Sequence, residues 1–103
     1  MHYAVSGQFL SNKSTEFLQL LTDGTIASQK PDGKEIVASM RRAVVDQGGI
    51  VRWSEVCYCP TPLQHERATV YDHFFSELET REIDGYQEFT GQPLMEFLQE
   101  QPS

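Results

Sequence analysis

Apolar and polar side chains alternate along two stretches of the chain, which is typical of half-buried strands. In residues 2–10, Tyr3, Val5 and Phe9 share one side, and polar residues occupy most of the other side. Residues 50–59 begin after two glycines and are rich in β-branched and aromatic side chains. We therefore expect a strand at each position, with the second strand near the centre of the sheet.

Apolar residues recur at helical spacing elsewhere, and two of these stretches begin with start signals. Residues 32–35 (Asp-Gly-Lys-Glu) have the spacing of a capping box, in which two side chains satisfy free backbone N–H groups. In residues 61–64 (Thr-Pro-Leu-Gln), the threonine can cap a helix and the proline suits its first position. The spacing predicts helices over 16–21, from 35 to the glycine at 48, from 62 through 75, and over 93–98.

The order of these elements predicts the fold class. We expect an α+β protein, a two-layer α/β sandwich with a small sheet and helices on one face, for which a ferredoxin-like arrangement is the nearest common architecture. A chain of 103 residues is one domain. Residues 1–98 are expected to form it, with a frayed tail over 99–103. Residues 77–84 fit either an extension of the preceding helix or a polar edge strand.

Charge and composition narrow the classes of partner. The formal net charge of -7 arises after Trp53, where two arginines accompany ten acidic residues. Such a surface repels nucleic acids and anionic membranes, whereas it suits a basic protein partner. No apolar run approaches the ~20 residues of a membrane span, and the first residues lack the pattern of a signal peptide. We therefore expect a cytoplasmic protein.

Two charged residues stand where apolar residues are expected. Glu55 shares the core side of its strand with Trp53, and Arg67 lies near the centre of the apolar stripe on the following helix. A buried charge without a partner is very costly, so we expect Glu55 and Arg67 to form an ion pair. The pair is either a structural contact at the edge of the core or part of a ligand-binding pocket with Trp53 and Tyr71.

Four sulfur and nitrogen donors raise the question of a metal site. Cys57, Cys59, His65 and His73 have the spacing Cys-x-Cys-x5-His-x7-His, which matches no familiar zinc pattern. We expect both histidines on the solvent side of their helix, away from the thiols, and a thiol inside a sheet lacks the base that activates a nucleophile. The acidic residues between 77 and 84 lack the loop of an EF-hand. We expect free thiols, no metal and no cofactor.

The last expectation concerns self-association. The sheet face without helices would carry four residues that mix apolar and polar side chains, namely Ile50, Arg52, Val56 and Tyr58. Such a mixture suits an interface core with a polar rim, and a two-fold dimer is the commonest closed arrangement. The sequence favours a non-enzymatic interaction or regulatory module that acts as a homodimer. The alternative is a small enzyme or small-molecule-binding domain with its pocket around Glu55 and Arg67, and the sequence leaves open whether the chain is an enzyme.

Overall fold

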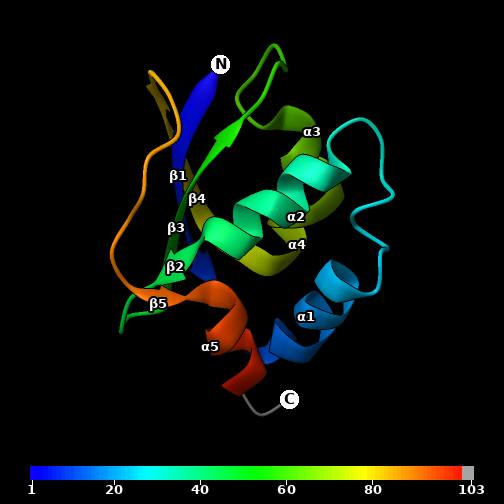
Figure 1. The fold of residues 1–103 in the computed structure, drawn as a ribbon, viewed down its shortest axis with the longest axis vertical. Helices are drawn as coiled ribbons and strands as arrows, with labels where there is room; N and C mark the ends of the chain where they lie inside the picture. Colours follow the sequence, from blue (N-terminus) through cyan, green and yellow to red (C-terminus); the bar gives the residue numbers. More distant parts are fainter. Residues whose placement is uncertain (101–103) are drawn as a thin grey trace.

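The molecule has two layers, a five-stranded antiparallel sheet and a set of helices that cover one of its faces (Figure 1). The computed structural model describes residues 1–100. The strands are β1 (His2–Phe9), β2 (Val44–Val45), β3 (Ile50–Val56), β4 (Phe75–Ile83) and β5 (Gln92–Pro93), in the sheet order β4-β1-β3-β2-β5. The α+β class and the two-layer sandwich predicted from the sequence are confirmed.

The helical layer comprises the 3₁₀ turn η1 (Ser11–Lys13), α1 (Ser14–Thr22), α2 (Gly33–Arg42), α5 (Leu94–Glu100) and a continuous helical segment over residues 64–74. That segment consists of α3 (Gln64–Glu66), the π-helical turn η2 (Arg67–Tyr71) and α4 (Asp72–Phe74). Along the chain, β1 is followed by α1 and α2, then by β2 and β3, then by the helical segment 64–74, and finally by β4, β5 and α5. The domain end expected at residue 98 falls inside α5, and residues 101–103 of the expected tail lie outside the described residues.

Burial along β1 shows how the sequence builds the core between the two layers. Tyr3, Val5 and Phe9 are buried, whereas the residues between His2 and Gln8 that point the other way are partly exposed. The Phe9 ring packs against Phe17 of α1 and Phe75 of β4, with centroid distances of 5.9 and 5.7 Å. Aromatic contacts at these distances add to the stabilisation from apolar burial. The alternation predicted for residues 2–10 is therefore confirmed.

Residues 77–84 belong mainly to the edge strand β4 rather than to a helix. Charged residues along this strand suit an edge, because they oppose pairing with another chain. The pairing of β4 with β1 shifts register between Ser6 and Gln8, and Glu77 adopts a positive φ of 54°. A Cβ on Gly7 would lie 2.8 Å from Leu78 Cδ1, so the close approach of the strands favours glycine there.

The ends of two elements differ from the sequence prediction. The strand expected over 50–59 ends at Val56, and the residues that follow it form a loop. The helix expected to start at Pro62 begins instead at Gln64, because Leu63 adopts the left-handed conformation with a φ of 56°. This loop and its left-handed residue set which side chains of the next helix face the core.

The capping box predicted at residues 32–35 is also wrong. Within residues 1–100, no side chain caps α2, although Asp32 precedes its first residue. The Asp32 carboxylate instead contacts His65, and the Glu35 carboxylate accepts a hydrogen bond from the backbone N–H of Val56. Both side chains therefore join α2 to segments that are distant in sequence.

The sheet face without helices is partly covered by residues 84–91, which connect β4 to β5 on the side opposite the helices (Figure 1). The Ser54 hydroxyl donates to the carbonyl of Gln87 at 2.9 Å and accepts from the Gln87 N–H at 3.0 Å. The Tyr86 ring lies 4.4 Å from the guanidinium of Arg42 on α2. The open area of this face is therefore smaller than the sequence suggested.

Self-association through the remaining open area is our first testable prediction. Ile50, Arg52 and Val56 are half-buried on β3, and Tyr58 is 87% exposed in the loop beyond it. We expect light scattering to report a dimer at tens of micromolar protein. Tyr58→Glu should shift it toward monomer without unfolding it, because the side chain lies in solvent, whereas Gln19→Glu on the exposed side of α1 should not. A wild-type monomer at that concentration would contradict the prediction.

Candidate functional site

Glu55 is fully buried on β3, together with two residues predicted to share its pocket. Its Oε1 accepts a hydrogen bond from Trp53 Nε1 at 2.8 Å and another from the Tyr71 hydroxyl at 2.6 Å. Within residues 1–100, its Oε2 has no hydrogen-bond partner. These three side chains lie together as predicted, but they form part of the core.

Arg67 does not join them, so the predicted Glu55–Arg67 ion pair is wrong. The Arg67 side chain is 42% exposed, and its Nε donates to Asp72 Oδ1 at 3.1 Å. The helix starts two residues later than expected and widens into a π-helical turn, which changes the face that each side chain occupies. Glu66, rather than Arg67, is the charged residue that this segment buries, at 1% exposure.

Burial dominates the electrostatics of Glu55. Desolvation raises the pKa of its carboxyl group to about 8, and the nearby carboxylates of Glu66 and Glu35 add to the rise. The hydrogen bonds from Tyr71 and Trp53 act in the opposite direction but are outweighed. Glu55 is therefore mostly protonated at neutral pH, which is how a core tolerates a carboxyl group without a basic partner.

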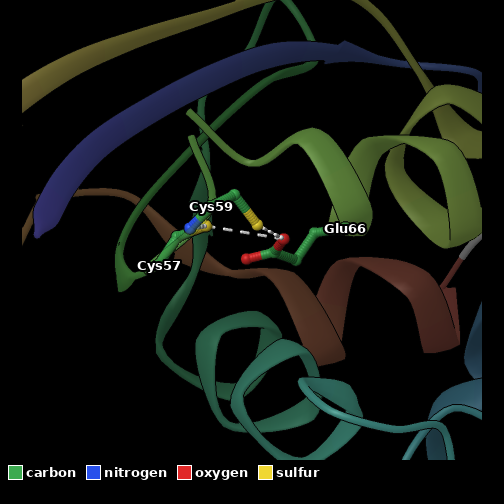
Figure 2. Close-up of side chains that lie close together, drawn as sticks. All are labelled: Cys57, Cys59 and Glu66. Carbon is green, nitrogen blue, oxygen red and sulfur yellow. Dashed lines mark hydrogen bonds between the residues drawn. The ribbon is translucent and has the colours of Figure 1, made fainter. Parts of the chain in front are cut away.

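Two thiols converge on the carboxylate of Glu66 just beyond the end of β3 (Figure 2). Glu66 Oε1 lies 3.6 Å from Cys57 Sγ and 3.5 Å from Cys59 Sγ. The backbone N–H of Cys59 also donates to Cys57 Sγ at 3.2 Å. We call Cys57, Cys59 and Glu66 the thiol–glutamate site. None of the ion pairs formed within residues 1–100 includes Glu66.

The Cys57 thiol is not an activated nucleophile. Burial raises the pKa of this thiol to about 12, and its hydrogen bonds to the side chains of Cys59 and Glu66 add to the rise. A thiol that keeps its proton reacts slowly, because the thiolate is the nucleophile. Both cysteines are free, and the arrangement gives no support to nucleophilic catalysis by Cys57.

A second group of donors adjoins the first through Glu66. Side-chain ligand atoms of Asp32, His65 and Glu66 lie within 4.8 Å of one another, as do those of Cys57, Cys59 and Glu66. His65 Nδ1 and Asp32 Oδ2 are 2.8 Å apart, which joins α3 to the start of α2. The Asp32 Oδ1 atom is buried and has no partner within the described chain.

These observations remove the reason given for expecting no metal. That expectation placed both histidines away from the thiols, but only the exposed His73 is remote, and His65 adjoins Glu66. It also omitted Glu66. Helical spacing could have identified this residue, because it lies three residues after the buried Leu63 and four before the buried Val70. Asp32 is brought in from a distant segment, for which the sequence carries no local signal.

A cavity of about 360 Å³ opens beside the thiol–glutamate site. Its lining includes Asp32, Val56, Cys57, Tyr58, Cys59 and Glu66. The donors therefore border a space that a small ligand or water can enter. In contrast, neither Glu55 nor Arg67 lines this cavity, and their side chains bond to different partners.

Comparisons with protein families, with curated proteins and with solved structures find no match to this chain. Among the helices of residues 1–100, none is both long enough and apolar enough to cross a membrane. Function is therefore inferred from the chemistry of the site itself.

The raised pKa of Glu55 generates a prediction about stability and pH. In the folded state, Glu55 keeps its proton at pH values above its ordinary pKa of 4.5. The stability that this proton contributes is therefore fully present below pH 4.5 and is lost as the pH rises toward 8. Glu55→Gln keeps an acceptor oxygen for Trp53 and Tyr71 but does not titrate. We expect the unfolding free energy of wild type, relative to Glu55→Gln, to fall between pH 5 and pH 8.

Chemical denaturation across that pH range is the measurement, with Glu88→Gln on the exposed connection as the control. Because Glu88 is exposed, its replacement should leave the pH dependence of wild type unchanged. Parallel curves for wild type and Glu55→Gln would show that Glu55 binds its proton no more tightly in the folded state.

Proposed function

We propose that this chain is a metal-binding domain that holds a zinc ion between Cys57, Cys59 and Glu66. The observation that carries the proposal is the buried carboxylate of Glu66, whose hydrogen-bond donors within residues 1–100 are two thiols. A thiol is a weak donor, and an uncompensated buried carboxylate is strongly destabilising. A cation that replaced the two thiol protons would supply the missing compensation.

The separations between the donor atoms support this proposal. Zinc binds thiolate sulfur at about 2.3 Å and carboxylate oxygen at about 2.0–2.2 Å, which puts sulfur and oxygen about 3.5–3.7 Å apart in a tetrahedron. The two sulfur–oxygen distances here are 3.6 and 3.5 Å. The donors would therefore need little movement to coordinate one ion.

The donor types favour zinc over calcium or magnesium. Thiolates are soft ligands that zinc accepts, whereas calcium and magnesium require oxygen ligands. The N–H of Cys59 that donates to Cys57 Sγ would orient the sulfur, as partners outside the coordination sphere do in known metal sites. The fourth ligand position would face the cavity, where water or a small ligand would complete the tetrahedron.

Such an ion would join the end of β3 to the start of α3. Between them lies a loop with two prolines and the left-handed Leu63, so the ion would fix the relative positions of the sheet and the helical segment. This role is a binding and structural one, in keeping with the non-enzymatic module favoured by the sequence.

The direct test is zinc titration of the chain after chelator treatment and dialysis under reducing conditions. We expect zinc to bind tightly to wild type. Removing one ligand should weaken binding by at least about 10- to 100-fold in each of three variants, Cys57→Ser, Cys59→Ser and Glu66→Gln. Known metal sites lose that much affinity when only a residue that hydrogen-bonds to a ligand is replaced. His73→Ala should bind as wild type, because His73 is exposed and remote from the site. A wild-type chain that binds no zinc would overturn the proposal.

Zinc should also stabilise the fold. Free zinc at 100 times the Kd should raise the unfolding free energy by about 2.7 kcal/mol, provided that the unfolded chain does not bind it. We expect zinc to raise the melting temperature of wild type by more than that of the Cys57→Ser/Cys59→Ser double variant, which lacks both sulfur ligands. Equal shifts in the two proteins would show that zinc binds elsewhere.

A further inference from the structure

We propose that Asp32, His65 and Glu66 form a second cation site, which shares Glu66 with the zinc site. The inference rests on the proposed function, because Glu66 belongs to both sets of ligands. Ligand atoms within each set lie within 4.8 Å of one another. The five side chains come from three separate places in the chain: the start of α2, the loop after β3, and α3.

An unpartnered oxygen at Asp32 is the first observation in favour. Asp32 Oδ1 is buried without a hydrogen-bond partner within residues 1–100, while His65 holds the other oxygen at 2.8 Å. A buried acceptor without a donor is costly, and an ion bound at Asp32 Oδ1 would remove that cost. Asp32 and Glu66 also line the same cavity, through which an ion can enter.

Charge is the second observation. One divalent ion with two thiolates and one carboxylate leaves a net charge of -1, and the Asp32 carboxylate adds another negative charge beside it. Neither Asp32 nor Glu66 forms an ion pair with Lys or Arg within the described chain. A second cation would neutralise this excess, because opposite charges in a poorly solvated site attract strongly.

Glu35 also lines the cavity, but it belongs to neither group of closely spaced donor atoms. Its Oε2 accepts hydrogen bonds from the Val56 N–H at 3.0 Å and the Tyr86 hydroxyl at 3.0 Å, and it lies 3.4 Å from Arg42. Glu35 is therefore a structural residue here. This leaves Asp32 and His65 as the donors available to a second ion.

Glu66 can serve two ions because a carboxylate has two oxygens. Oε1 faces both sulfurs, which leaves Oε2 for the neighbouring ion. Bridged pairs of ions in proteins are about 3.5–4 Å apart, a separation that one carboxylate spans. The second ion would have nitrogen and oxygen ligands, which suit zinc, cobalt or manganese. His65 Nδ1 now contacts Asp32 Oδ2, so an ion bound by both side chains would replace this direct contact.

Metal stoichiometry tests the inference, by native mass spectrometry and by titration with zinc. We expect two zinc ions per wild-type chain. Asp32→Asn and His65→Ala should each leave one tightly bound ion, because the thiol–glutamate site keeps its ligands. His73→Ala is the matched control and should keep two ions. Thermal melts identify any variant that fails to fold, and Asp32→Asn is the milder change, since it keeps an acceptor oxygen for His65.

Cobalt titration assigns the order of filling. The first equivalent should produce thiolate-to-cobalt charge-transfer absorption, and the second should add only bands of cobalt with nitrogen and oxygen ligands. In His65→Ala the second phase should be absent and the first unchanged.

Three results separate the two proposals. One ion in wild type, unaffected by His65→Ala, would overturn the second site and leave the first intact. One ion that His65→Ala weakens as much as Cys57→Ser does would make His65 a ligand of the first site and would also overturn the inference. No ion at all would overturn the proposed function itself.

Discussion

Two glutamates buried between the sheet and the helical segment 64–74 impose the main physical constraint on this structure. Glu55 and Glu66 are 0% and 1% exposed, and within residues 1–100 neither forms an ion pair with a basic side chain. A buried carboxylate must be neutralised by a proton, by hydrogen bonds or by a cation. The two glutamates have different surroundings, which favour a different means of neutralisation for each.

Glu55 is neutralised by a proton. It lies among aromatic side chains, its Oε1 accepts from Trp53 and Tyr71, and desolvation raises the pKa of its carboxyl group to about 8. These groups hold a neutral acid in place. Glu66 instead faces two thiols and a cavity of about 360 Å³, with Asp32 and His65 beside it. Donors of this kind suit a metal ion. We therefore propose a structural role for Glu55 and a metal-binding role for Glu66.

Much of the architecture follows from local pattern. Strict alternation predicts β1, helical spacing predicts α1 and α5, and the mixed order of elements predicts a two-layer α+β sandwich. Local pattern also indicates that Glu55 and one charged residue of the next helix occupy apolar positions. It identifies the wrong helical residue, because the left-handed Leu63 and the π-helical turn alter the phase of the helix. A shift of one residue, from Arg67 to Glu66, replaces the predicted ion pair with the thiol–glutamate site, which we propose to bind zinc.

The rest of the candidate site depends on contacts that no local pattern specifies. Asp32 has the position of a helix cap, yet its side chain bonds to His65, 33 residues further along the chain. Glu35 has the second position of the capping box and binds the backbone of β3, 21 residues away. Both contacts arise because α2 packs against the end of β3 and the start of α3. Sequence spacing therefore indicates the donor types but not the side chains that meet.

X-ray absorption spectroscopy of the zinc-loaded chain tests the central claim most directly, because it reports the ligands of the ion rather than the strength of binding. With one equivalent of zinc, the account predicts two sulfur neighbours at about 2.3 Å and oxygen or nitrogen neighbours at about 2.0–2.2 Å. The sulfur contribution should disappear in the Cys57→Ser/Cys59→Ser double variant. A wild-type spectrum with only oxygen and nitrogen neighbours would contradict the assignment of Cys57, Cys59 and Glu66 as the zinc site.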